Sequence, residues 1–469
     1  MSLLRWIAVT GLLLVSASAQ AGTIHPALQA EMDATAPDAT VSVLVYMAEQ
    51  APIAGMNQEL RAEKATMLQR HSEVITALQS TASRTQADLR TFLDSGIRNG
   101  SVQGYTSYWI MNAFVVDATK EAIRQIAARI DVDQVEPNYG VSLIEPVEMH
   151  LPPVGEEAYD GPRGIGVTPG LRAIRAPEVW YQLGYNGAGR VLANLDTGVD
   201  GNHPALRDRW RGVGGQHPWQ ECWLDVLGTG TTFPTDTYGH GTHVMGTIAG
   251  LGAATNDTIG VSWGAQWIAT NAINQGVGGG FDADVITCLQ WLADPDGNPN
   301  TIDDVPDVVQ NSWRINEGFG QGYTDCDSRW WAAIDNCEAA GVVTTWSAGN
   351  EGPGAQTIGS PPDRAATAYN TLSVGAVDAT NYQWPYPIAG FSSRGPTGCN
   401  VAPELKTKPE VSAPGVDVYS SIPGGGYDGT WDGTSMAGPH VAGIVGLIRQ
   451  ANPNLDVDSV KEILSLIHI

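Results

Sequence analysis

The pattern of hydrophobic and polar positions divides the chain into a short leading part and a longer second part. In the leading part, a β-branched run predicts a strand at residues 41–47, and helical spacing of apolar residues predicts an amphipathic helical stretch over about 59–93. A strand at 105–118, a helix at 120–130 and a strand at 132–138 follow. This β-α-β-α-β order, close to the split β-α-β pattern, predicts a small α+β, ferredoxin-like domain.

In the second part, short apolar strands alternate with helical patterns. Strands are predicted at residues 191–195, 307–312, 341–347 and 372–377, with helices at 283–293 and 328–340. Such alternation predicts an α/β fold, a mostly parallel sheet with helices on both faces. In sheets of this kind the functional groups gather at the carboxyl ends of the strands.

Composition sets the domain boundaries. A chain of 469 residues is too long for one ordinary core. Residues 145–170 are rich in proline, glycine and acidic residues, which indicates a linker. We therefore predict a first domain over residues 22–150, a linker running to about 170, and a second, truncated domain over 171–463. The last six residues, 464–469, are interpreted as a non-native tail after a truncation, with a genuine short terminus as the alternative.

The first 21 residues have the pattern of a secretory signal peptide. Arg5 precedes an apolar run at residues 6–15, and small residues follow, so cleavage is predicted after Ala19 or Ala21. The apolar run is too short to span a bilayer, although an uncleaved anchor is the alternative. We expect a secreted protein, extracellular or periplasmic, with no membrane association after the signal is removed.

The net charge limits the possible partners of the protein, and the cysteine content bears on its disulfides. The formal net charge of −25 argues against nucleic acid as a partner and favours a monomer, because copies of the chain repel one another. Export permits disulfides, but an odd number of cysteines leaves at least one without an intrachain partner. The pairing stays open among Cys222, Cys288, Cys326, Cys337 and Cys399.

Two motifs of the second part contain groups suited to proton transfer. Asp196 follows a predicted strand in LDTG, where it could accept the Nδ1 proton of a histidine, although an aspartate there is also a common turn former. His240 lies between two glycines in GHGTH, which allow the neighbouring backbone to approach closely. His243 suggests a metal ligand, but no further ligands stand at suitable spacing, so a structural, hydrogen-bonded histidine is expected.

Two further motifs contain a nucleophile and an amide donor. Ser435 begins the apolar, glycine-rich run SMAGPHVAGIVGLIRQ, where it is either a helix cap or a nucleophile beside the free N–H groups of a helix start. Asn350, in SAGNEG after a predicted strand, could donate to an oxyanion. Nucleophile, base, orienting carboxylate and oxyanion donor together make a complete acyl-transfer set.

In these motifs the chain resembles the subtilisin-like serine peptidases, the subtilases, and looks most similar to their bacillopeptidase F branch. The resemblance rests on LDTGVDGNHPAL, GHGTHVMGT, SAGNEG, FSSRGP and GTSMAGPHVAG and covers about residues 173–463. It implies a secreted serine endopeptidase made as an inactive precursor, whose leading domain is an inhibitor-like propeptide removed by cleavage in the linker. A non-catalytic peptide-binding relative is the alternative; an esterase is disfavoured because the serine lies in GTSMA rather than G-x-S-x-G.

The resemblance also implies roles for individual residues. Asp196 orients the base, His240 is the general base and then acid, Ser435 attacks, and Asn350 holds the oxyanion together with the Ser435 N–H. The implied substrate-binding residues are Ser312, Trp313, Arg314, Ala348, Gly349 and Glu351. Arg314 and Ile315 replace glycines that the family usually has, and Glu351 at the rim is predicted either to favour basic side chains or to be a solvated surface carboxylate.

Cofactors and partners are implied in the same way. The chemistry requires no cofactor, while a structural calcium ion, common in the family, is expected without assigned ligands. The expected partners are protein and peptide substrates and the protein's own propeptide as an intramolecular inhibitor.

Overall fold

The computed structural model describes residues 21–139, 148–149, 166–252, 257–273, 280–317, 322–368, 370–381 and 384–466. The predicted signal peptide up to residue 20, most of the predicted linker and residues 467–469 of the suspected tail lie outside the described residues. None of the helices in the described ranges is long and apolar enough to cross a membrane. Residues 21–139 are called the leading unit below, and residues 166–466 the larger domain.

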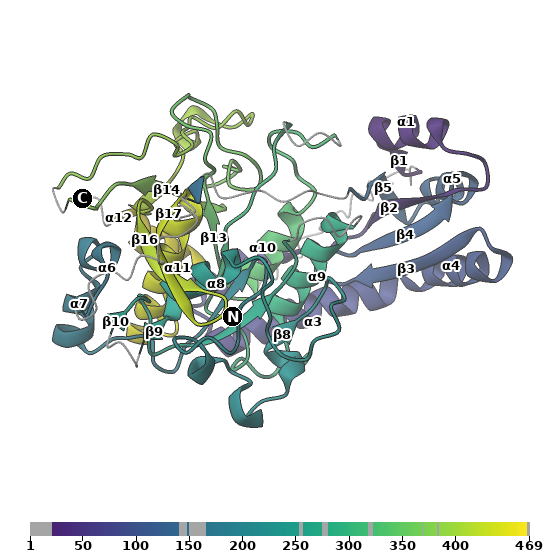
Figure 1. Cartoon of the computed structure of the whole chain (residues 1–469). Helices are drawn as coiled ribbons and strands as arrows, with labels where there is room; N and C mark the ends of the chain where they lie inside the picture. The colour runs from purple at the N-terminus through teal and green to yellow at the C-terminus, as the bar shows by residue number, and fades with distance from the viewer. Residues whose placement is uncertain are drawn as a thin grey trace, which may run out of the picture.

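A seven-stranded sheet forms the centre of the larger domain (Figure 1). Its strands follow the order β15-β14-β13-β12-β7-β11-β8, and every neighbouring pair is parallel. The strands are β7 Val191–Leu195, β8 Trp223–Leu224, β11 Gln266–Thr270, β12 Val308–Asn311, β13 Val343–Ser347, β14 Leu372–Val377 and β15 Val411–Pro414. Every residue of β7, β12 and β13 is buried, as expected for strands covered on both faces. The predicted parallel sheet is therefore confirmed.

The strand order decides which helices lie together. From β7 the chain moves through α8 to β11 on one side, then returns through α9 to β12 on the other side of β7. Because such crossovers are right-handed, the reversal puts α8 and α9 on opposite faces of the sheet. α8 packs with α11, and α9 with α10. These helices are α8 His240–Ala249, α9 Phe281–Ala293, α10 Trp331–Ala339 and α11 Thr434–Ala451.

The reversal also positions the site. The adjacent strands β7 and β12 are connected to strands on opposite sides of the sheet, and in open α/β sheets the loops after the carboxyl ends of two such strands are where ligands bind. Asp196 directly follows β7, and Ser312 directly follows β12. The remaining elements of the larger domain surround this core: α6 Pro169–Ala173, α7 Ala176–Glu178, η1 Val179–Leu183, η2 Arg207–Arg209, η3 Val213–Gly215, η4 Trp219–Glu221, β9 Leu251–Gly252, β10 Asp257–Thr258, η6 Pro403–Leu405, β16 Val418–Ile422, β17 Gly426–Asp432 and α12 Val457–Leu466.

The leading unit is a five-stranded sheet with helices. Its strand order is β1-β5-β2-β4-β3, and the chain order from β2 to β5 follows a β-α-β-β-α-β pattern. The elements are β1 Thr23–Ile24, α1 Pro26–Ala34, β2 Thr40–Met47, α2 Ile53–Ala62, α3 Met67–Thr85, α4 Ala87–Asn99, β3 Val102–Tyr108, β4 Ala113–Thr119, α5 Lys120–Ala127 and β5 Val132–Pro137. The two-residue strand β6, Glu148–Met149, lies in the predicted linker and pairs antiparallel with β17.

Two predicted elements of the leading unit were wrong in extent. The stretch 59–93 contains parts of three helices, because Thr66 caps a new helix at Met67 and the chain turns again at Gln86. The predicted strand 105–118 is a hairpin, with Tyr108 opposite Ala113. The turn escaped prediction because its residues are apolar. Ile110 and Met111 are buried against the larger domain, where an ordinary hairpin turn would face water.

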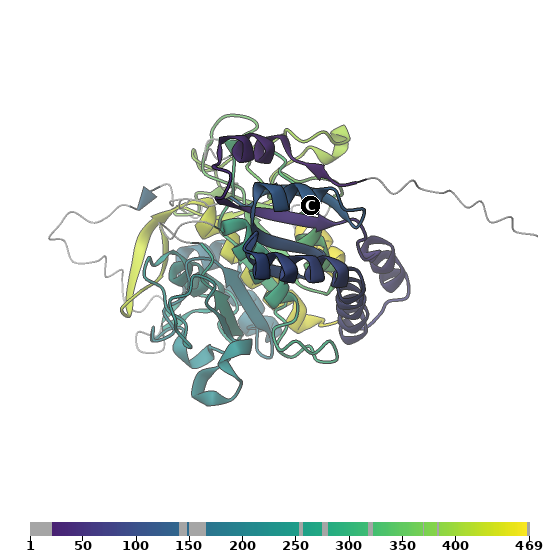
Figure 2. The same ribbon diagram turned by 90° about the vertical axis from the view of Figure 1, so that its right-hand side faces the viewer.

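The sheet of the leading unit has two apolar faces because successive side chains of a strand point to opposite sides. In β2, Val43 and Val45 pack into the unit's own core, whereas Leu44 between them joins the core of the larger domain. In β4, Phe114 packs into the unit's own core and Val115 joins the core of the larger domain. Figure 2, viewed from that side, shows the leading unit in front of the larger domain. The leading unit is therefore docked through a continuous hydrophobic contact.

Polar contacts fix the register of this docking. The Gln290 side-chain oxygen accepts hydrogen bonds from the backbone N–H groups of Trp109, at 2.7 Å, and Ile110, at 3.2 Å. The Asn336 side chain donates to the Ile110 carbonyl at 2.6 Å. Since Gln290 lies on α9 and Asn336 on α10, the β3–β4 turn is held between the two helices. Docking therefore occupies one helical face of the larger domain.

One disulfide joins Cys326 to Cys399, across loops that flank α10 and β15. Cys337 lies on α10 and is a free, buried thiol, as are Cys222 and Cys288. A bond between Cys326 and Cys337, one of the pairings left open by the sequence, is thus excluded. Leu464, in the suspected tail, is fully buried within α12.

Candidate active site

Asp196 and His240 form the central hydrogen bond of the site. The Nδ1 atom of His240 lies 2.7 Å from Asp196 Oδ1, and both side chains are almost completely buried. The same carboxylate oxygen accepts the Thr197 backbone N–H at 2.8 Å. Because a carboxylate only accepts, Nδ1 carries the proton in this pair, and Nε2 is left to act as a base. The structure therefore brings together the first two residues that the sequence singled out.

Glycines and an unpredicted aspartate hold His240 in place. A Cβ atom on Gly241 would lie 2.0 Å from the Gly198 carbonyl oxygen, so no side chain fits there, and Gly239 has a φ of +105°. Asp236 accepts from the backbone N–H groups of Gly239, at 2.8 Å, and Thr242, at 2.9 Å. It thereby satisfies free donors at the start of α8, the helix that begins with His240. Sequence reasoning missed Asp236, although its place four residues before His240 was a usable signal.

The pKa values of the two neighbouring histidines, His240 and His243, are shifted in opposite directions. Burial lowers the pKa of His240, but the charge and hydrogen bond of Asp196 outweigh it, so this pKa is raised above its ordinary value. Burial, followed by the His240 charge, lowers the pKa of His243 to about 3. His243 Nε2 lies 2.9 Å from the Val418 carbonyl, and its ring stacks on Trp431 at 4.5 Å. The prediction of a structural, hydrogen-bonded His243 is confirmed.

Ser435 stands in the first turn of α11, which begins at Thr434. Its hydroxyl donates to the Ser312 carbonyl at 3.3 Å, and the Ser312 hydroxyl donates to the Ser435 carbonyl at 3.2 Å. The Ser435 carbonyl needs this partner because Pro439, four residues on, has no N–H to complete the helical hydrogen bond. The end of β12 and the start of α11 are thus joined at Ser435, and its hydroxyl caps no helix nitrogen.

Asn350 has its amide group fixed in orientation. Its side-chain oxygen accepts from the backbone N–H of Thr434 at 2.8 Å and from the Thr434 hydroxyl at 2.9 Å. Because the oxygen is engaged by a backbone donor, the amide NH₂ points the other way, and a Cβ on Gly433 would lie 3.5 Å from this nitrogen and 3.6 Å from the Ser435 nitrogen. Asn350 Nδ2 and the Ser435 N–H therefore lie beside the same small space at the start of α11.

The predicted substrate-binding residues are only partly suited to that role. Trp313 is 1% exposed and packs among Phe281, Trp330 and Trp346 in the core, so its side chain faces away from any substrate. Ala348 is fully buried, and its N–H donates to Val374 at 3.0 Å within the sheet region. Ser312 and Gly349 remain beside Ser435, because the Gly349 N–H is held by the Thr434 hydroxyl at 3.1 Å.

An ion pair between Arg314 and Glu351 bears on the two alternatives predicted for Glu351, a preference for basic substrates or a solvated carboxylate. Arg314 lies against Gly349, and its guanidinium contacts the Glu351 carboxylate, which also accepts from the Asn350 N–H and from the Ser393 hydroxyl. Burial lowers the pKa of Arg314 to about 10. The Glu351 charge is therefore compensated by a protein cation, which reduces the attraction that it could exert on a basic side chain. Both residues were named from the sequence, but their contact was not.

Two clusters in the described ranges have metal-ligating side chains. The first combines Asp363 with Cys326 and Cys399, whose sulfurs are consumed by the disulfide and cannot bind as thiolates. The second contains Asp294, Asp296 and Asp304. Burial, and after it the carboxylates of its neighbours, raises the pKa of Asp304 to about 6.

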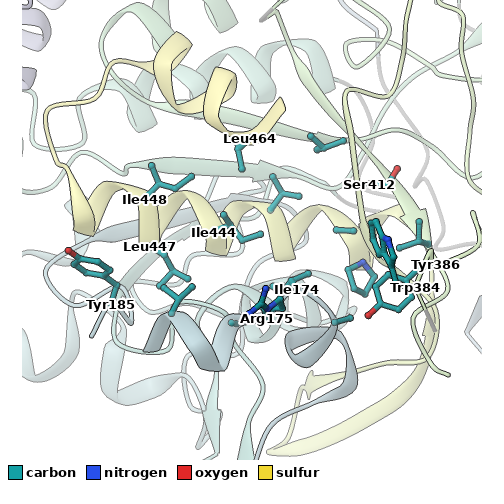
Figure 3. A pocket seen from close by; sticks show the side chains of 18 of the residues that line it. Ile174, Arg175, Tyr185, Trp384, Tyr386, Ser412, Ile444, Leu447, Ile448 and Leu464 are labelled. Atoms are coloured by element: carbon teal, nitrogen blue, oxygen red, sulfur yellow. The ribbon is translucent and has the colours of Figure 1, made fainter. Parts of the chain in front are cut away.

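A large apolar cavity lies apart from these polar groups. It measures about 550 Å³ and lies between α11, α12 and the segment from Ala173 to Tyr185 (Figure 3). Ile444, Leu447 and Leu464 line it, whereas Asp196, His240, Ser435 and Asn350 do not. Its lining is mostly apolar, and none of the nucleophile, base, carboxylate and amide groups singled out from the sequence is part of it. The candidate site is therefore the group of polar residues at the strand ends.

Comparison with known proteins agrees with this geometry. Residues 187–466 match the subtilase family, peptidase S8. The chain is 36% identical over 425 residues to bacillopeptidase F of Bacillus subtilis (strain 168), covering 87% of this chain and 27% of that protein, so it spans about a quarter of that relative's length. It is 32% identical over 367 residues to subtilisin J of Geobacillus stearothermophilus, covering 78% of this chain and 77% of the relative. A solved structure, the S41 psychrophilic protease, matches with 30% identity and a TM-score of 0.46, covering 60% of this chain and 83% of that chain. The chain belongs to the subtilase family of serine peptidases.

Proposed function

We propose that this chain is a serine endopeptidase that cleaves peptide bonds through an acyl-enzyme on Ser435. The observation that carries the proposal is the buried 2.7 Å hydrogen bond between His240 and Asp196 at the same strand ends that hold Ser435. A non-catalytic peptide-binding relative would have no need for this buried, charge-compensated histidine. Membership of the subtilase family supports the same reaction class.

The reaction follows from the positions of these groups. His240 Nε2 removes the proton from the Ser435 hydroxyl while the serine oxygen attacks the carbonyl carbon of the substrate, and Asp196 stabilises the resulting imidazolium. The carbonyl oxygen becomes an oxyanion that accepts hydrogen bonds from Asn350 Nδ2 and the Ser435 N–H. His240 then returns its proton to the leaving amine, and the carbon–nitrogen bond breaks. A water molecule, deprotonated by His240, hydrolyses the ester.

A fluorophosphonate probe tests the nucleophile. The protein is incubated with the probe, and the adduct is located by mass spectrometry of its peptides. We expect a single adduct on Ser435 and parallel loss of peptide hydrolysis, because phosphonylation requires an activated serine. A folded protein that hydrolyses no peptide and takes up no probe would identify a binding relative instead.

Replacement of Asn350 by alanine is expected to lower kcat about 10² to 10³-fold, the range known for the oxyanion asparagine of subtilisin, with little change in KM. The reason is that its NH₂ group faces the oxyanion, which exists only in the transition state and intermediate. Steady-state kinetics on a peptide substrate measure the effect. An unchanged kcat would remove Asn350 from the oxyanion site.

The pH dependence should follow His240. Because Asp196 raises its pKa above the ordinary value near 6.5, and because only neutral His240 can accept the serine proton, kcat/KM should fall as the pH decreases through this raised pKa. The acid limb is therefore expected above pH 6.5. A profile that stayed flat from pH 8 to pH 6 would contradict the assignment of His240 as the base.

Substrate preference should depend on the Arg314–Glu351 pair. In Glu351→Gln the guanidinium of Arg314 loses the compensating charge of Glu351, so acidic side chains before the scissile bond should gain in kcat/KM by about tenfold relative to neutral ones. A peptide library with varied residues at this position measures the preference. Equal profiles for the two proteins would show that the pair does not face the substrate.

The leading unit is proposed to be an inhibitory propeptide that the enzyme removes itself. Its docking on α9 and α10 through buried apolar and hydrogen-bonded contacts supports a stable, inactive precursor. Cleavage within residues 145–170, the predicted linker, would separate the two units. We further propose that residues 1–21 direct secretion, to the extracellular space or the periplasm, and that the mature enzyme is a monomer acting on proteins and peptides.

A further inference from the structure

The loop between α9 and β12 concentrates negative charge. Asp294 follows the last residue of α9, and Asp296 and Asp304 lie further along the same loop. One ligand atom from each of the three residues lies within 4.8 Å of the others. Three carboxylates this close repel one another strongly unless a cation lies among them.

Two of these carboxylates are buried with an oxygen that has no donor. Asp304 is 1% exposed and Asp294 is 5% exposed, and the Oδ1 atom of each accepts no hydrogen bond. The other oxygen of Asp304 accepts the Asp296 backbone N–H at 2.8 Å, which turns its carboxylate into the loop. A buried carboxylate oxygen without a partner is costly, so these atoms indicate a ligand.

Nearby basic side chains donate no hydrogen bond to the Oδ1 atoms of Asp294 and Asp304. Arg211 pairs at 2.8 Å with Asp303, the residue next to Asp304, and not with the cluster. The nearest basic group given for Asp294 is His71 of α3, whose Nε2 lies 3.7 Å from Oδ1, beyond hydrogen-bond distance. Over the parts of the chain that the structure describes, no lysine or arginine forms an ion pair with any of the three aspartates.

We propose that Asp294, Asp296 and Asp304 bind a calcium ion. Calcium prefers oxygen ligands, tolerates irregular geometry and accepts six to eight of them, so backbone carbonyls and water complete a set that begins with three carboxylates. A thiolate or imidazole ligand, which zinc or copper would favour, is not part of the cluster. The ion would connect the end of α9 to the start of β12.

The same loop lies under the leading unit. Gln79 of α3 donates to Asp294 Oδ2 at 3.5 Å, and Ser72 of α3 donates to Asn300 Oδ1 at 3.5 Å. An ion that orders this loop therefore also orders part of the surface on which α3 docks. The calcium site would stabilise the docked precursor as well as the larger domain.

Calcium titration of the full chain tests the proposal. The Ser435→Ala chain is used so that no self-cleavage occurs, and it is freed of metal with chelator before calcium is added in a calorimeter. We expect the melting temperature to rise by about 5 °C at saturating calcium, since a ligand that binds only the folded state stabilises it. Because the readouts are binding and melting, the result is independent of the proposed peptidase activity.

Three variants in this background locate the ion. Asp296→Asn, at an exposed position whose carboxylate accepts from the Asn298 N–H and the Thr301 hydroxyl at 2.7 Å each, and Asp304→Asn should each weaken calcium binding at least about tenfold and reduce the melting shift. Asp303→Asn, next to the cluster but ion-paired with Arg211, is the matched control and should bind calcium like the parent. Calcium binding and melting shifts that are unchanged in Asp296→Asn, or absent in the parent chain, would overturn the proposal.

Discussion

Replacement of Ser435 by alanine is expected to lower kcat on a peptide substrate by about 10⁶-fold, the magnitude known for loss of the subtilisin nucleophile. The hydroxyl of Ser435 stands at the start of α11, beside the amide of Asn350 and above the end of β12. Without it no acyl-enzyme forms, and only the positioning of substrate and the oxyanion donors remain. The measurement is steady-state hydrolysis of a chromogenic peptide by enzyme freed from its leading unit.

The control for this variant is Ser328→Ala. Ser328 is exposed in the larger domain, so the same loss of a hydroxyl there should leave kcat unchanged. Circular dichroism of both variants would show whether the fold is retained. A Ser435→Ala protein that keeps more than about 1% of wild-type turnover would exclude Ser435 as the nucleophile.

The second large effect is expected at Asp196. Asp196→Asn should lower kcat by about 10⁴-fold, as the same change does in other Ser-His-Asp peptidases. The charge of Asp196 raises the pKa of His240 and stabilises its imidazolium, and a neutral amide does neither. The amide nitrogen would also stand in place of Oδ1 or Oδ2; Oδ2 is buried without a hydrogen-bond partner, and a buried NH₂ group left without an acceptor is costly.

Asp208→Asn gives the matched comparison for Asp196. Its side chain is 70% exposed, so it removes the same formal charge far from any buried partner. Activity of Asp208→Asn should stay at the wild-type level.

The acid limb of the pH profile should shift to lower pH in Asp196→Asn alone, because the charge that raises the pKa of His240 is lost. An unshifted limb would mean that Asp196 does not act through His240.

The candidate catalytic residues could be predicted from sequence because each is fixed by its local neighbours. Asp196 directly follows a fully buried strand, His240 lies between glycines that permit close approach of Gly198, and Ser435 lies in the first turn of an apolar helix. Short-range patterns of this kind survive into the fold with little influence from distant residues. The parallel sheet was predictable for the same reason, since its strands are apolar throughout.

Other features depended on contacts between distant residues. The hairpin at Tyr108 was predicted as one strand because its turn is apolar, and that turn is apolar because it packs between α9 and α10. The Arg314–Glu351 ion pair and the Cys326–Cys399 disulfide join segments that no periodicity relates. Asp236 was missed because an isolated aspartate in a loop usually forms a turn, and its five donors become visible only in three dimensions.

The most direct test of the account follows the mass and the new amino termini of the full chain with time, for the wild type and for Ser435→Ala. The account predicts that the wild type is cut within residues 145–170 and that Ser435→Ala stays intact. Cleavage of both proteins at the same rate would show that another protease acts. A folded wild type that stays uncut and also takes up no fluorophosphonate would contradict the proposed catalytic role of Ser435.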